Sequence, residues 1–141
     1  MEHVRGRQDG QPTRAGDAGT FTGRVMMDGL LADGDGDATN VRVNSVVFEP
    51  GGRTFWHSHA GGQVLIVGTG RGMIETRDGD RHALHPGDIV WAAPGEEHWH
   101  GAAPDRFMAH IALWEGDEVN WLDHVTDAEY AGPRHSTRCQ H

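Results

Sequence analysis

Residues 50–70 read PGGRTFWHSHAGGQVLIVGTG, and this stretch decides the fold that we expect. It holds two short runs of strand-forming residues, 53–59 and 63–67, and glycine clusters bound each run. Such clusters mark tight turns between strands. The pattern continues with Asp-Gly-Asp at 78–80, a hairpin signal, and Pro-Gly-Asp at 86–88. Short strands at even spacing predict an all-β sandwich or barrel.

The pattern weakens toward both ends of the chain, which sets the expected domain boundaries. Residues 1–19 are polar and aperiodic, so we expect a flexible N-terminal arm. Residues 20–131 are expected to form one domain, and residues 132–141 a frayed tail. Within the domain, residues 28–39 are rich in Gly and Asp and are expected to form a surface loop.

The C-terminal part of the domain changes from a strand period to a helical one. Thr126 and Glu129 have the spacing of a capping box, which predicts the start of a short helix. A single helical stripe would hold Trp121, Leu122, Val125 and Tyr130. We therefore expect a short C-terminal helix that lies against the β structure.

Two His-x-His pairs carry the functional signal. They are His57 with His59 and His98 with His100. Residues i and i+2 of a strand point to the same face, so each pair directs two imidazoles to one side. A strand can chelate a metal ion in this way, although neighbouring histidines on a surface strand are also common without one. Gln63 follows a turn after the first pair, and its amide oxygen could join the same centre.

A third histidine lies in the alternating run 107–114. His110 shares one face of that run with Met108, Ala112 and Trp114. A buried histidine needs a polar partner, and a backbone group often serves, so His110 alone is weak evidence for a site. Three strands that each direct histidine to one side favour a shared centre over three separate core histidines.

These residues resemble the two sequence motifs of the cupin superfamily. The first motif is matched by Gly51, His57, His59, Gln63 and Gly70, although Glu usually stands where this chain has Gln63. The second is matched from Gly87 through Pro94-Gly95 to His98, with the proline shifted by one residue and Ala102 in place of the usual final Asn. The resemblance implies a single cupin barrel, which is a double-stranded β-helix or jelly roll.

A closer resemblance, over roughly residues 21–130, is to small bacterial cupins that act as manganese-dependent hydroxynitrile lyases. It rests on PGGRTFWHSH, GQVLIVGTG, HPGDIVWAAPGEEHWHGAAP and VNWLDHVTDAEY. The resemblance implies the metal ligands His57, His59, Gln63 and His98. It also implies His100 and His110 as catalytic histidines, with Thr54 near the substrate. Trp114 departs from that group, which has a pocket-lining Gln there, so the resemblance does not fix the substrate size or the substituent preference of this chain.

The expected chemistry is cyanohydrin cleavage to an aldehyde and HCN, or its reversal, on mandelonitrile-type substrates. Three imidazoles and an amide oxygen leave two positions of an octahedral ion open, as a catalytic metal requires. Manganese is the ion that the resemblance implies, and Fe²⁺, Co²⁺, Ni²⁺ and Zn²⁺ also suit these donors. His100 or His110 would take the hydroxyl proton. Phe55, Met73 and Trp114 are candidates for an apolar wall of the substrate pocket.

Two alternatives remain open at this point. One is a metal-dependent cupin dioxygenase with iron in the same site, and the other is a small-molecule-binding cupin without catalysis. His100 and His110 favour an enzyme over a binding module, because simple binding does not require extra titratable groups on the same cavity.

The composition limits the partners. The formal net charge of −9 and the lack of a basic stripe argue against nucleic-acid binding. The longest apolar run, residues 64–67, is too short to cross a membrane, and one cysteine, Cys139, suggests a reducing cytoplasm. We expect a small-molecule partner, an aldehyde or cyanohydrin. We also expect a homo-oligomer, a dimer or a tetramer, because open sheet edges favour pairing.

Overall fold

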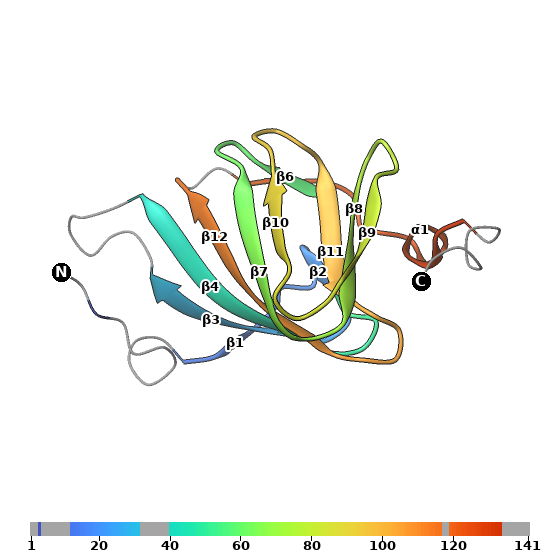
Figure 1. Ribbon diagram of the computed structural model, residues 1–141, viewed down its shortest axis with the longest axis horizontal. Helices are drawn as coiled ribbons and strands as arrows, with labels where there is room; N and C mark the ends of the chain where they lie inside the picture. Colours follow the sequence, from blue (N-terminus) through green and yellow to red (C-terminus); the bar gives the residue numbers. More distant parts are fainter. Residues whose placement is uncertain (1–2, 4–11, 32–39, 117–118, 134–141) are drawn as a thin grey trace.

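The computed structural model describes residues 3, 12–31, 40–116 and 119–133. In these ranges the chain forms many strands and one short helix, and the strands build two curled sheets around a common interior (Figure 1). All strand pairs are antiparallel, and the predicted all-β jelly-roll barrel with a short C-terminal helix is confirmed. Within the described ranges no helix has the length and apolar character needed to span a membrane.

The first sheet has six strands in the order β1-β3-β4-β12-β7-β10. Their bounds are β1 Arg14–Ala15, β3 Val25–Leu31, β4 Val41–Phe48, β12 Met108–Glu115, β7 Gln63–Gly70 and β10 Ile89–Ala92. β12 pairs with β4 along its full length and with β7 on its other side, where a bulge falls between Ala109 and His110. His110 therefore lies on a central strand, held between two partners.

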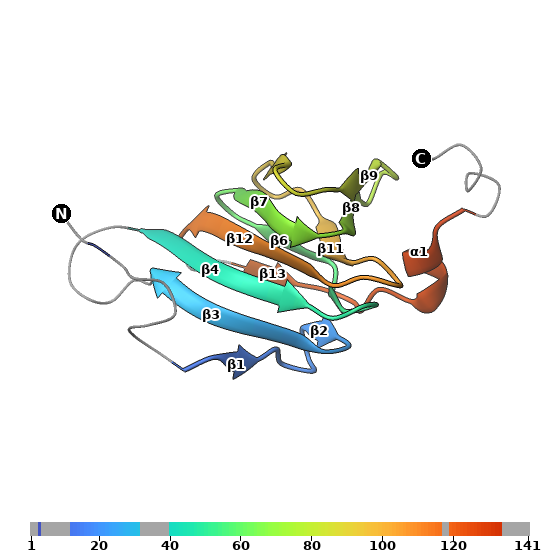
Figure 2. The ribbon, with the colours of Figure 1, turned by 60° about the horizontal axis from the view of Figure 1, so that its bottom comes forward.

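The second sheet has the order β13-β6-β11-β5-β2, and β8 pairs with both β11 and β9 (Figure 2). The bounds are β2 Phe21–Thr22, β5 Arg53–Thr54, β6 His57–His59, β8 Gly72–Thr76, β9 Arg81–Leu84, β11 His98–Ala102 and β13 Val119–Trp121. The two His-x-His pairs stand on β6 and β11, which are neighbours in this sheet.

Two glycines show why the turns follow the sequence pattern. Gly79 closes the predicted β8–β9 hairpin with a φ of 92°, a conformation that L side chains rarely adopt. Gly70 ends β7 with a φ of 85°, and a Cβ there would collide with the backbone carbonyl of Phe107. The glycine is therefore required both by the local conformation and by the close approach of the next sheet strand.

Two apolar clusters hold the sheets. The larger lies inside the barrel and includes Phe48, Leu65 and Met108, each with no exposed surface. The smaller one, Trp56, Trp99 and Val125, lies between the second sheet and the C-terminal segment. The interior cluster fills one part of the barrel, and the remaining part holds the histidines.

The predicted capping box is present at the C-terminal helix. α1 spans Asp127–Ala131, and its N-cap Thr126 accepts from the backbone N–H of Glu129 while the Glu129 carboxylate accepts from the Thr126 N–H. Tyr130 anchors the helix by donating from its hydroxyl to the carbonyl of Ala102 at 2.6 Å.

Three local expectations differ from the structure. Arg14–Ala15, inside the segment expected to be an arm, pairs with β3, because two residues suffice for a β bridge on an open sheet edge. β3 continues to Leu31, so the loop expected from residue 28 starts later; residues 32–39 lie outside the described residues. Trp121 belongs to β13 rather than to a helical stripe, because pairing with β6 overrides the local period.

Candidate active site

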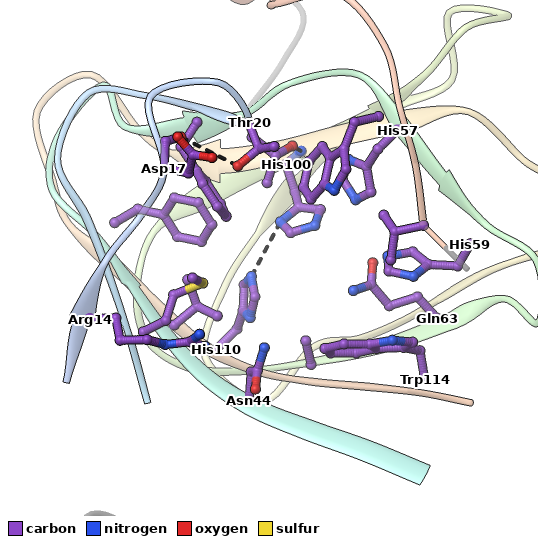
Figure 3. Close-up of a pocket in the computed structure, with 18 of the residues that line it drawn as sticks. Arg14, Asp17, Thr20, Asn44, His57, His59, Gln63, His100, His110 and Trp114 are labelled. Carbon is purple, nitrogen blue, oxygen red and sulfur yellow. Dashed lines mark hydrogen bonds between the residues drawn. The ribbon is translucent and has the colours of Figure 1, made fainter. Parts of the chain in front are cut away.

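A cavity of about 280 Å³ lies inside the barrel, between the two sheets. One part of its lining is polar and is formed by His57, His59, Gln63, His100 and His110 (Figure 3). All five side chains are buried. The other part is mainly apolar, so the cavity offers a polar end for chemistry and an apolar space beside it.

The sheet register brings the two predicted pairs together. His57 on β6 stands opposite His98 on β11, and their ring centroids are 4.4 Å apart. His59 and His100 follow two residues along their own strands and so face the same side. Gln63, the first residue of β7, reaches the group from the other sheet.

Hydrogen bonds set the tautomers of His57 and His98. The Nδ1–H of His57 donates to the Phe55 carbonyl and that of His98 donates to the Glu96 carbonyl, both at 2.9 Å. Each neutral ring therefore carries its lone pair on Nε2. Metal-binding histidines show this arrangement, because a bond from one nitrogen orients the other toward the ion.

A cation would resolve a contact that the side chains leave unfavourable. His98 Nε2 lies 3.2 Å from Gln63 Oε1. With the His98 proton on Nδ1, both atoms are acceptors, and two lone pairs face each other. A shared cation would turn this contact into two favourable ones.

Other ring nitrogens around the same cavity also lack hydrogen-bond partners. Both ring nitrogens of His59, Nε2 of His100 and Nδ1 of His110 are buried without a hydrogen-bond partner. Ring nitrogens of His57, His98 and His100 lie within 4.8 Å of one another, a spacing that suits a common ion. Buried unpaired polar atoms are costly, so the donor set fits a divalent ion or a bound ligand.

The histidines are neutral at ordinary pH. Burial lowers the pKa of His59 and the pKa of His110 to about 4. Burial, and then the neighbouring histidines, hold the pKa values of His57 and His100 well below the usual value, and burial also lowers the pKa of His98. Neutral imidazoles can bind a metal or accept a proton, which a protonated ring cannot do.

His100 and His110 form a hydrogen-bonded pair. His110 Nε2 lies 3.2 Å from His100 Nδ1, and the dashed line in Figure 3 marks this contact. Thr54 supports the pair, because its Oγ1 accepts from the backbone N–H of His100 at 3.2 Å. The Thr54 hydroxyl hydrogen is not used in that bond and is available to a ligand. With the proton between the rings on His100, the wall offers one base, the lone pair of His100 Nε2, and two hydrogen-bond donors, the His110 Nδ1–H and the Thr54 hydroxyl.

Two of the expected pocket residues do not line the cavity. Phe55 lies after the end of β5, outside the cavity lining, and its ring packs edge-on against His124 with the ring centroids 6.1 Å apart. Met73 lies on the opposite face of β8 from the buried Ile74, and it packs against the cluster around Trp56 and Trp99. Trp114 does line the cavity, with its ring 5.4 Å from that of His59.

A comparison with models of known families matches the cupin domain over residues 44–114. The chain is also 46% identical over 127 residues to the (R)-mandelonitrile lyase of Granulicella tundricola, covering 88% of this chain and 95% of that protein. The chain belongs to the cupin family.

Solved structures agree with this assignment. A cupin-like protein from Thermotoga maritima is 44% identical, with a TM-score of 0.79 over 82% of this cupin and 89% of that chain. The polyketide cyclase RemF from Streptomyces resistomycificus has a TM-score of 0.69 over 92% of this chain and 90% of its own, at 20% identity. The second likeness shows the shared fold alone.

Sequence reasoning missed several residues of the cupin cavity. The Trp121 ring lies beside that of His57, tilted by 32° with the ring centroids 4.6 Å apart, and the ring centroid of Phe21 lies 5.8 Å from that of Trp121. Both come from short strands, β13 and β2, that are too brief to show a period. Arg14 also lines the cavity and comes from the segment read as an arm. No local pattern identifies these residues, because their position depends on pairing with distant strands.

The lowered histidine pKa values predict acid sensitivity of the metal-free cupin. Between about pH 6.5 and pH 4 the unfolded chain binds more protons than the folded one, so stability is fully present above this window and is lost as pH falls through it. We expect the melting temperature to fall by about 5 °C or more between pH 7 and pH 4.5, measured by calorimetry.

The matched variants separate this effect from general acid unfolding. A His59→Gln/His110→Gln variant should show a shallower fall, and a variant with the exposed His82 and His85 changed to Gln should follow the wild type. An equally steep fall in the first variant would exclude the buried imidazoles as the cause.

Proposed function

We propose that this cupin is a metal-dependent hydroxynitrile lyase, which cleaves a cyanohydrin to an aldehyde and HCN or forms it in reverse. The observation that carries the proposal is a group of buried, unpaired imidazole nitrogens around one cavity. It occurs in a chain 46% identical to an (R)-mandelonitrile lyase across nearly the whole length of both. Fold alone would not support it, because the barrel hosts many activities.

The residues that would hold the ion are His57, His59, Gln63 and His98. His57 and His98 have Nε2 lone pairs set by their backbone hydrogen bonds, Gln63 offers its amide oxygen, and His59 has no other partner. When bound, a divalent ion, Mn²⁺ in our proposal, supplies Lewis acidity that lowers the pKa of a cyanohydrin hydroxyl. Every donor in this set is neutral, so the ion keeps its full charge.

The His100–His110 pair is suited to move the hydroxyl proton. With the His100 Nδ1–H donating to His110 Nε2, the unpaired Nε2 of His100 is a lone pair able to accept the substrate's proton. The Nδ1 proton can then pass to His110, so the positive charge need not stay on one ring. Because burial lowers the pKa of His110 to about 4, the pair stays unprotonated in mildly acidic solution.

The bond changes balance without any redox partner. The hydroxyl proton goes to the histidine pair, the oxygen forms the carbonyl double bond, and the carbon–carbon bond to the nitrile breaks with its electron pair on cyanide. The same pair returns the proton, and HCN leaves. The Thr54 hydroxyl accepts from the His100 N–H, and in this proposal its own hydrogen is donated to the substrate oxygen.

The apolar part of the cavity suits an aromatic substituent. Its walls include Phe21, Phe48, Trp114 and Trp121, and these surround space beside the histidines. Burial of a ring there would supply binding energy at about 25 cal/mol per Å² of apolar surface removed from water. A mandelonitrile-type substrate would therefore place its phenyl group against these side chains.

The direct test is cyanide release from mandelonitrile at mildly acidic pH. Metal-free protein is prepared with a chelator, reloaded separately with Mn²⁺, Fe²⁺, Co²⁺, Ni²⁺ or Zn²⁺, and compared with buffer. We expect a rate above the buffer rate with at least one ion and none after chelation. Release at the buffer rate with every ion, especially with oxygen uptake on a phenolic or diketone substrate, would contradict the proposal.

Gln63→Glu tests the need for a neutral donor set. The new carboxylate would stand about 3.2 Å from His98 Nε2, where it would add a negative charge to the proposed ligand set and weaken the Lewis acidity of a bound ion. We expect cyanide release to fall by at least about 10-fold while the affinity for the divalent ion stays equal or rises. Steady-state rates and metal titration measure the two effects, and an unchanged rate would show that the amide is not important for its neutrality.

A further inference from the structure

We propose that Arg14 binds a carboxylate at the mouth of the cavity, so that the preferred substrate is an aldehyde or cyanohydrin with an anionic group distant from its reacting carbon. The reaction in this proposal rests on the proposed lyase function. The binding of the anion does not, and it can be measured separately.

The sheet register directs Arg14 inward. Arg14 pairs with Met27 across β1 and β3, and Ala15 pairs with Met26. Met27 lines the cavity, whereas Met26 is 38% exposed on the outer face. Paired residues of neighbouring strands share a face, so the Arg14 side chain lies on the inner side with Met27. Figure 3 shows Arg14 to one side of His110, with Gln63 and His59 on the other.

The guanidinium is available to a ligand. Among the described residues it has no hydrogen bond or ion pair, in contrast to Arg53 and Arg81, which bind backbone carbonyls and carboxylates. The carboxylate nearest in the lining is that of Asp17, and its Oδ1 already accepts from the Gly19 N–H at 3.0 Å. Arg14 thus lines the cavity at its solvent-exposed mouth, and its five donors, which have no partner among the described residues, are open to a bidentate acceptor.

Charge makes this end of the cavity selective. The chain carries a net charge of −9, so most of its surface repels an anion. Arg14 is the one Lys or Arg side chain among the residues that line the cavity, and the lining histidines are neutral because burial lowers their pKa values. Arg14 is thus the position in the lining that attracts an anionic group. The apolar walls between Arg14 and the histidines suit an aromatic ring that joins this group to the reacting carbon.

The kinetic test compares two aldehydes that differ only in charge, 4-formylbenzoate and benzaldehyde, in HCN addition by the Mn²⁺-loaded protein. We expect Arg14→Gln to raise KM for 4-formylbenzoate by about 10-fold and to change KM for benzaldehyde by less than about 2-fold. Arg14→Lys should restore part of the difference. Arg24→Gln, which removes an exposed arginine paired with Glu49, is the matched control and should behave as the wild type.

A binding measurement distinguishes this proposal from the proposed function. Calorimetric titration with 4-(hydroxymethyl)benzoate should show binding that weakens about 10-fold in Arg14→Gln and declines with added salt. Equal loss for both aldehydes, or unchanged binding in Arg14→Gln with an unchanged melting temperature, would overturn the role of Arg14. If no cyanide chemistry is found at all, the lyase function fails, and the titration alone decides the anion site.

Discussion

His98→Ala is expected to lower the affinity for the divalent ion by at least about 100-fold and to reduce cyanide release in proportion. His98 stands at the centre of the candidate metal site. Its ring lies against His57, its Nε2 faces Gln63, and its Nδ1 is held by the Glu96 carbonyl. His57 approaches His98 from a neighbouring strand of the second sheet, and Gln63 approaches it from the first sheet, so His98 links the two halves of the proposed ligand set. Elemental analysis of purified protein and metal titration measure the loss.

The same measurement identifies the third imidazole. The proposed set uses His59, whereas the ring nitrogens that lie within 4.8 Å of one another are those of His57, His98 and His100. We expect His59→Ala to lose metal affinity and His100→Ala to retain it, because His100 Nδ1 is engaged with His110. His82→Ala, on an exposed histidine, is the control. Full metal content in His98→Ala would show that the ligand set is wrong.

His110→Ala is expected to lower kcat by about 10² to 10⁴ while the protein keeps its metal. The pair with His100 is the route by which the proton leaves and returns, and without His110 the charge must stay on a ring crowded by other histidines. The effect should fall on kcat more than on KM, since the aromatic group of the substrate binds elsewhere. Rapid mixing with mandelonitrile and elemental analysis supply the two readouts.

Two outcomes would contradict this role of His110. Loss of metal together with activity would make the residue structural, since its ring packs against that of Phe48, tilted by 52° with the ring centroids 5.3 Å apart. Full activity of the His110→Ala variant would show that His110 does not take part in proton transfer. His110→Gln keeps a polar group of similar length, so it should disturb folding less than His110→Ala and lower kcat equally. It therefore distinguishes loss of the imidazole from loss of packing.

Much of the barrel could be predicted because its signals are local. The hairpin around Gly79 and the capping box of Thr126 and Glu129 each involve residues a few positions apart, and the structure shows both. The His-x-His pairs are equally local, because the period of a strand alone directs both rings of a pair to one face. Phe55 and Met73 do not line the cavity, because Phe55 lies beyond the end of β5 and Met73 lies on the face of β8 opposite the buried Ile74.

Sequence alone determined that this chain is a barrel of short strands with paired imidazoles, because turn chemistry and side-chain alternation depend on neighbours along the chain. Only the tertiary structure decided that His57 faces His98, that His100 bonds His110, and that Arg14 and Trp121 border the same cavity. Those relations follow from the register of strands far apart in sequence. A shift of one residue would turn each side chain to the other face, so no local pattern specifies them.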